Sequence, residues 1–279
     1  KVRPTRTGTL QLQVNVGANL EDASSNALDT ASAIVDDTTL TVTSSGATAI
    51  SVNYSDSVFV NSLAVVHTIE DVVVADALGR TLVYVVNSET ASLLTNLTYG
   101  SQSFTKAVDA GGYKVSEIWY LDSPAVGTAD VVAQWDGPAR GRCGVLSLTG
   151  VEPGGPTASS TTTFPDDAEV QRSIDLTTVD SNTFVLGTCL QNNGFGDPVK
   201  PAAWSAFFNG DAGSANCDAG YRYEVTPALK TYTWTNVKED GSIAVAAFSP
   251  TDTTAPTLSS GDIADDQSGG PVQTNEVVT

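Results

Sequence analysis

Short runs of alternating or continuous apolar residues recur through most of the chain, and turn residues separate them. Asn-Gly and Asp-Gly pairs, as at Asn209-Gly210 and Asp240-Gly241, are typical of tight turns between antiparallel strands. Repeating βαβ units are absent, which excludes a parallel α/β sheet. The pattern predicts an all-β fold, an antiparallel, jelly-roll-like β-sandwich of two packed sheets. The predicted strands are Val58–Val66, Thr81–Val86, Leu93–Tyr99, Phe104–Asp109, Lys114–Leu121, Thr128–Trp135, Cys143–Leu148, Gln171–Leu176, Thr183–Leu190, Ala203–Phe208, Gly220–Val225, Lys230–Thr235 and Ser242–Phe248.

Residues 1–57 have a different pattern, and we expect them to be an N-terminal attachment or assembly segment. Polar and apolar residues alternate without a break over Thr9–Val16, which predicts a half-buried strand. Asn19 is placed to cap a short helix whose apolar stripe reaches Val35, and Thr39–Thr43 returns to strand-like alternation. The apolar face of the first predicted strand carries Leu10, Leu12, Val14 and Val16.

The predicted sandwich domain covers residues 58–250, and residues 251–279 follow it as a linker. This tail is too short to form a sandwich alone. It is therefore either the start of a further module or an extended arm that packs on a neighbouring subunit.

The composition makes the chain strongly acidic, with a formal net charge of −19 and an isoelectric point near 4.1. Nucleic-acid partners are not expected, because phosphate backbones need clustered Lys and Arg. No run of apolar residues is long enough for a membrane-spanning helix, so membrane insertion is not expected. Since the chain starts with Lys and has no Met, we expect it to be part of a longer product. Three of its 13 basic residues form a small basic arm at the N-terminus: Lys1, Arg3 and Arg6.

Three cysteines, Cys143, Cys189 and Cys217, lack the CxxC spacing of zinc sites. Three free thiols are expected, with a bridge between Cys189 and Cys217 as the alternative. Loops rich in Asp and Asn, such as that from Asn209 to Asp218, suit Ca²⁺ but lack EF-hand spacing. A Ca²⁺ site is thus the alternative to a solvated acidic surface, and no other cofactor is expected.

The residues offer little for catalysis, and we expect a protein that is not an enzyme. His67 is the only histidine, so a Ser-His-Asp triad would have to be built around it. Glu117 and Glu224 are the only glutamates inside aromatic-rich predicted strands, which makes them the candidates for a glycosidase pair. No residue is assigned a catalytic role.

Most aromatic residues fall inside the predicted strands, where a sandwich core is the first interpretation. The alternative is a sugar-stacking platform on one sheet. The candidate ligand-facing aromatics are Trp204, Tyr221, Tyr223 and Trp234.

Core and turn motifs recur over about residues 58–250 and carry a resemblance to a known family. They are Leu97–Lys106, Glu117–Leu121, Pro124–Ala129, Leu146–Val151, Ala203-Trp204, Ala219–Tyr221, Tyr232–Trp234 and Ala246–Pro250. Together they resemble a sandwich domain of tailed-bacteriophage structural proteins that also occurs in secreted bacterial surface proteins, and Asp252–Leu258 is similar to the opening of an immunoglobulin-like repeat. The resemblance implies a non-enzymatic building or decorating module and supplies no catalytic residues.

We therefore expect a virion structural protein of a tailed phage, a capsid decoration protein or a head or tail fibre subunit, located on the virion surface. Its partners would be other virion subunits, including copies of itself, and host-surface glycans are a further candidate partner. Attachment is expected through Lys1, Arg3 and Arg6 and through the strand Leu10–Val16, added to a neighbour's sheet edge. Two alternatives stay open. One is an extracellular bacterial filament or adhesin subunit that assembles by strand donation, and the other is a carbohydrate-binding module.

Overall fold

The computed structural model describes residues 49–90, 92–112, 114–166, 170–192 and 196–251, with only the backbone for residues 60–63. It also describes four short strands nearer the N-terminus. The chain divides into two compact units: one is Thr48–Thr251, and the other combines Lys1–Ala47 with Asp252–Thr279. In the latter unit β1 pairs with β4 and β2 with β3, both antiparallel. The bounds of these strands are β1 (Gly8–Leu10), β2 (Gln13–Val14), β3 (Ile34–Val35) and β4 (Leu40–Val42).

These short strands decide part of what was predicted for the N-terminal segment. Leu10 and Val14 do lie in strands, as the alternation indicated. The predicted helix is wrong at its end, because Ile34 and Val35 form a strand that pairs with Gln13–Val14. The other predicted attachment residues lie outside the described residues, as does the tail beyond Thr251; they are Lys1, Arg3, Arg6, Leu12 and Val16.

All elements described within Thr48–Thr251 are β-strands with antiparallel pairing, which confirms the predicted all-β sandwich. The strands of its first half are β5 (Ser51–Val74), β6 (Thr81–Ser88), β7 (Leu94–Tyr99), β8 (Gln102–Ser103), β9 (Thr105–Asp109), β10 (Val115–Asp122) and β11 (Gly127–Thr149). Those of its second half are β12 (Ala158–Phe164), β13 (Gln171–Thr177), β14 (Thr183–Asn192), β15 (Ser205–Asp211), β16 (Ala215–Glu224), β17 (Leu229–Thr235) and β18 (Gly241–Phe248).

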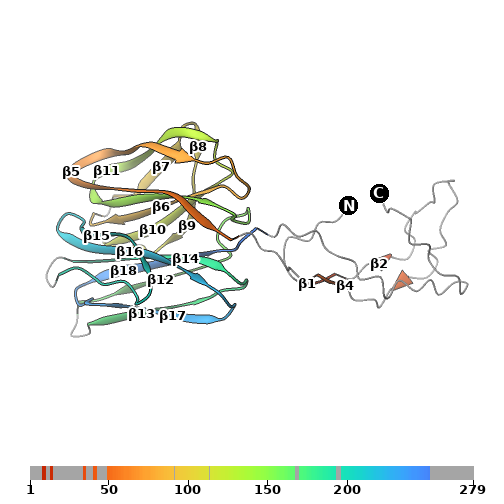
Figure 1. Ribbon diagram of the computed structural model, residues 1–279. Helices are drawn as coiled ribbons and strands as arrows, with labels where there is room; N and C mark the ends of the chain where they lie inside the picture. The colour runs from red at the N-terminus through yellow and green to blue at the C-terminus, as the bar shows by residue number, and fades with distance from the viewer. Residues whose placement is uncertain are drawn as a thin grey trace, which may run out of the picture. The chain divides into compact units, whose positions relative to one another are not determined.

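The strands form four layers, which Figure 1 shows stacked from β7 and β8 at one end to β13 and β17 at the other. The two inner layers are five-stranded, with the strand orders β5-β11-β6-β10-β9 and β12-β18-β14-β16-β15. The strands β5 and β11 are long enough to belong to two layers. The outer layer of the first half contains β7, β8 and those halves of β5 and β11 that pair with each other outside the inner sheet. The outer layer of the second half is the hairpin of β13 and β17.

Three hydrophobic cores separate these four layers. The central core lies between the two inner sheets, where Leu146 and Leu148 of β11 meet Leu186 of β14 and Phe248 of β18. Each inner sheet also packs its other face on its own outer layer. Alternation along each inner strand therefore sends every second side chain to one core and the rest to another, which explains strands that are buried throughout, such as β6 and β18.

The two halves are copies of one sandwich. Each inner sheet has five strands, which can be numbered in chain order within their copy. In both sheets the order from one edge to the other is then first, fifth, second, fourth and third. Registers agree as well: Glu117 in β10 lies opposite Val86 in β6, and Asp218 in β16 lies opposite Cys189 in β14. Even the irregularity recurs, because one extra residue, Ala107 in β9 and Phe207 in β15, interrupts the pairing of the edge strand at the same point.

A buried polar network joins the two copies across the central core. The Asn87 side chain of β6 donates a hydrogen bond to the Thr188 hydroxyl of β14 at 2.7 Å and accepts one from the Ser116 hydroxyl of β10 at 3.0 Å. Ser116 in turn accepts a hydrogen bond from the Ser242 hydroxyl of β18 at 2.9 Å. All four side chains are buried, so their hydrogen bonds are satisfied only when the sheets are in one register.

Three features of the strands differ from the prediction. The first strand begins at Ser51 rather than Val58 and continues to Val74. The predicted strands Thr128–Trp135 and Cys143–Leu148 form one continuous strand, β11, which pairs with β5. The edge strand Ala158–Phe164 was not predicted, because its Ser and Thr residues give no alternation of polar and apolar positions.

The polar network gives the first prediction. Asn87→Leu keeps the branched shape of the side chain but removes the hydrogen bonds that Asn87 makes with Thr188 and Ser116, so the free energy of unfolding should fall by about 2–3 kcal/mol. Urea denaturation measures this. Asn53→Ala, which removes a hydrogen bond from an exposed side chain to Thr149, is the control and should cost less than about 0.5 kcal/mol. Equal losses for the two variants would contradict the network's role.

Candidate functional site

The two copies differ most at one place, the outer edge of the strand that carries the buried tryptophan. In the first copy Leu93 accepts a backbone hydrogen bond from Asp136, the residue after Trp135, and the chain then runs on as β7 along β11. In the second copy Val199 makes the equivalent backbone pair with Thr235, the residue after Trp234.

From Val199 the second copy takes a shorter path. Only four residues, Lys200 to Ala203, connect Val199 to Trp204, which occupies the position of Phe104 in the first copy. Pro201 has no N–H to continue a ladder along β17, and its carbonyl instead accepts a hydrogen bond from the Trp204 backbone. The β7–β8 hairpin therefore has no counterpart among the residues described in the second copy.

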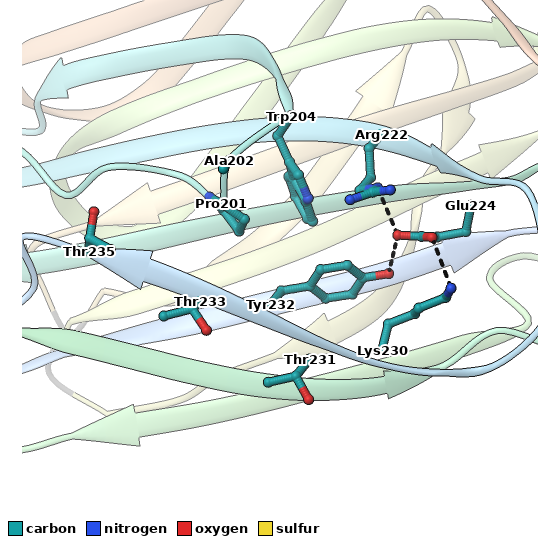
Figure 2. A pocket seen from close by; sticks show the side chains of 10 residues that line it. All are labelled: Pro201, Ala202, Trp204, Arg222, Glu224, Lys230, Thr231, Tyr232, Thr233 and Thr235. Atoms are coloured by element: carbon teal, nitrogen blue, oxygen red, sulfur yellow. Dashed lines mark hydrogen bonds and ion pairs between the residues drawn. The ribbon is translucent and has the colours of Figure 1, made fainter.

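A pocket of about 490 Å³ occupies this place. Figure 2 shows Trp204 and Tyr232 side by side in its floor, with the threonines of β17 spaced along one wall. The two rings meet edge to face with centroids 5.0 Å apart, and Trp204 packs on Trp234 in the same way at 5.5 Å. The lining consists of Pro201, Ala202, Trp204, Arg222, Glu224, Lys230, Thr231, Tyr232, Thr233 and Thr235.

Glu224 is the electrostatic centre of the pocket, and three side chains converge on its carboxylate (Figure 2). Arg222 Nε lies 2.7 Å from one oxygen and Lys230 Nζ lies 3.4 Å from the other. The Tyr232 hydroxyl donates a hydrogen bond to the carboxylate at 3.2 Å. Burial, with the nearby Glu224 charge, raises the pKa of Tyr232 well above its usual value, so this hydroxyl remains a donor. Two cations against one anion make the pocket locally positive on an acidic protein.

The wall formed by β17 presents unused backbone groups. The N–H and C=O of Thr235 point away from β13, because they pair with Val199. Backbone direction alternates along an antiparallel strand, so the N–H and C=O of Thr233 and Thr231 point the same way, toward the pocket. Among the described residues no strand pairs with β17 on this side beyond Val199.

The four candidate ligand-facing aromatics have different environments. Trp234 is fully buried in the core of the second copy, and Trp204 is 6% exposed, so neither presents an open ring face. Tyr221 and Tyr223 project from the opposite face of β16 and pack against Phe184, although 39% of Tyr223 remains exposed. The structure therefore does not bring the four rings together as one stacking surface.

The candidate catalytic residues are also separated. His67 is buried and packs against Trp135 with ring centroids 4.3 Å apart and ring planes tilted by 42°, and burial lowers its pKa, so it is neutral at pH 7. Glu117 belongs to the first copy, where Lys106 Nζ lies 2.7 Å away and Trp119 donates a hydrogen bond at 2.7 Å. Glu224 faces the outer layer of the second copy, so the two glutamates do not flank a common cleft.

The cysteines are free, as expected, and all three are buried. Cys189 faces the outer core of the second copy whereas Cys217 faces the central core, so a bridge between them is excluded by the sheet itself. Burial raises the pKa of the Cys143 thiol to about 12, which keeps it protonated. Within the described ranges no three His, Cys, Asp or Glu side chains are grouped as metal ligands.

The described part of the chain contains no helix with the length and apolar character needed to cross a bilayer. Comparison with models of protein families, with curated proteins and with solved structures found no match for this chain. Its residues and geometry are therefore the basis on which its function is inferred.

Sequence reasoning missed the pocket as a site, although it singled out Trp204 and Glu224. Arg222 lies two residues before Glu224 and Lys230 lies two residues before Tyr232, a spacing that any strand would show. Their meeting depends on how β16 of the inner sheet and β17 of the outer layer lie against each other around Glu224. The signal that was available is the short, proline-containing stretch before Trp204, compared with the longer stretch before Phe104.

Asp218, beside this pocket on the same face of β16, gives the second prediction. Burial is the main cause that raises its pKa to about 6, although the Lys200 backbone N–H donates a hydrogen bond at 2.5 Å. Because the folded-state pKa lies above the unfolded one, its contribution to stability is present below about pH 4 and is lost as the pH rises through about 6. Asp218→Asn should therefore gain about 2 kcal/mol of unfolding free energy relative to the unmodified chain between pH 4 and pH 7.5.

Urea denaturation at the two pH values measures that gain. The matched control is Asp76→Asn, whose side chain is 84% exposed, and it should change stability by less than about 0.5 kcal/mol at either pH. A constant difference between Asp218→Asn and the unmodified chain would mean that Asp218 does not titrate in this range.

Proposed function

We propose that this chain is a non-enzymatic structural subunit of a tailed-phage virion, a capsid decoration or fibre protein attached through its N-terminal segment. The same residues would also suit a bacterial extracellular filament or adhesin subunit. The observation that carries the proposal is the position of the two ends of the Thr48–Thr251 unit. Ser51 pairs with Thr149, Pro250 pairs with Val151, and the Thr251 N–H donates to Gly150 at 2.7 Å.

The chain thus comes into the doubled sandwich and leaves it at one point, the segment Thr149–Val151. The residues before and after the sandwich belong to one other compact unit. A rigid body that is an insertion into another unit can project from a surface without interrupting the contacts of the unit that carries it. This arrangement favours a displayed knob, with attachment made by the other unit.

The chemistry of the knob supports a structural role. Its buried titratable side chains serve packing and ion pairing, as His67 does on Trp135 and Glu117 with Lys106. The Thr48–Thr251 unit carries ten Lys and Arg against 22 Asp and Glu, and this acidity keeps crowded copies soluble. The separation of Trp204 and Trp234 from solvent makes a carbohydrate-binding module the weaker alternative.

Deletion of residues 1–17 tests attachment. The shortened chain should keep the stability of its sandwich, because those residues lie in the other unit, and it should remain monomeric where the full chain assembles. Light scattering after size-exclusion chromatography and electron microscopy measure the two states.

The matched control is a chain of unchanged length in which residues 1–17 are replaced by Gly and Ser, and it should also stay monomeric. Assembly of either variant at the concentration at which the full chain assembles would refute attachment through this segment.

A further inference from the structure

We propose that the open edge of β17 is an acceptor site for the strand Thr9–Val16 of a second copy of this chain. The inference rests on the proposed function and adds the residues at which one subunit receives the next. The first copy of the sandwich provides the internal precedent, because there the equivalent edge is covered by a strand.

In the first copy β7 supplies that cover. Leu97 lies opposite Ala133 of β11 and Tyr99 lies opposite Val131, and both side chains are buried in the core. Their neighbours Asn96 and Thr98 point outward. An uncharged segment with apolar residues at alternate positions is therefore what this edge of the fold accepts.

In the second copy no described residue pairs with the same edge from Thr233 back to Thr231, and the pocket lies where the inward side chains of a covering strand would go. The pocket floor is apolar at Trp204, Pro201 and Ala202, which suits Leu or Val side chains. A strand added here would form main-chain hydrogen bonds with the outward groups of the threonines, the mode by which edge strands bind peptides.

The segment Thr9–Val16 has the required pattern. It has no charged residue, and apolar residues occupy every second position, as the buried Leu97 and Tyr99 do in β7. Its described parts lie in the strands β1 and β2 and are thus already extended.

Charge complementarity selects a second copy as the source. The first 16 residues carry Lys1, Arg3 and Arg6 and no acidic residue. The sandwich that would receive them has 22 acidic residues against ten basic ones. The pocket itself is locally positive at Arg222 and Lys230, so the attraction acts between the basic arm and the acidic remainder of a neighbour's sandwich, which speeds association.

The test uses the full chain carrying Leu12→Asp, which is designed to disable its own donor strand while leaving the acceptor edge unchanged. A fluorescein-labelled peptide of residues 9–16 is titrated with this protein, and fluorescence anisotropy reports binding. One peptide should bind per chain. A peptide of the same eight residues in an order that removes the alternation should not bind.

The edge itself is tested by Thr233→Pro and its matched control Thr233→Val, each made in the same Leu12→Asp chain. Both variants lose the 2.7 Å contact between the Thr233 and Ser173 hydroxyls, but only proline removes the outward N–H. Thr233→Pro should weaken peptide binding at least about tenfold while Thr233→Val leaves it unchanged. Thermal unfolding of both variants confirms that the sandwich is intact.

Equal binding to the proline and valine variants, or no binding to any of them, would overturn the proposal. Protection of the Thr233 amide from hydrogen exchange in a monomer with an unmodified N-terminus would also overturn it, since the strand would then come from the same chain. Assembly of the full chain without peptide binding would remove this site but leave the proposed structural role. Peptide binding by a chain that never assembles would support this site but refute the proposed structural role.

Discussion

Face-to-face packing of the two five-stranded sheets is the interaction on which the rest of this molecule depends. Each sheet belongs to a different copy of the sandwich, and each copy alone would expose the face that now forms the central core. Apolar side chains such as Leu148 and Phe248 supply most of the stabilisation. The polar network from Asn87 to Ser242 fixes how the sheets are aligned, because its buried groups are satisfied in one arrangement only.

Doubling explains both the rigidity of the body and the location of its candidate site. Two copies of one architecture share strand order, register and even the extra residue in the edge strand, so a difference between them is informative. One large difference is the cover strand, β7, in whose place the described residues of the second copy have the turn at Pro201. The pocket, the positive charge around Glu224 and the backbone groups of Thr231 and Thr233 that pair with no described strand all lie where that cover is missing.

The sequence predicted the fold class and most inner strands because these strands carry dense apolar runs bounded by Gly and Pro. It failed at β12, whose Ser and Thr residues alternate in burial but not in polarity, and at Ile34, where tertiary pairing overrides a helical pattern. The internal repeat was invisible because equivalent positions share chemical character and burial rather than identity, as Glu117 and Asp218 do. The site was missed because the packing of the inner sheet on the outer layer, not sequence spacing, brings Trp204 to Tyr232.

Amide hydrogen exchange, compared between the isolated subunit and its assembled form, tests the central claim most directly. Val132 and Gln134 of β11 occupy the positions of Thr231 and Thr233 of β17, but their edge is covered by β7. The amides of the threonines should exchange rapidly in the isolated subunit while those of Val132 and Gln134 are protected, and assembly should protect all four. Slow exchange of the threonine amides in the isolated subunit, or rapid exchange after assembly, would contradict an open acceptor edge in the second copy.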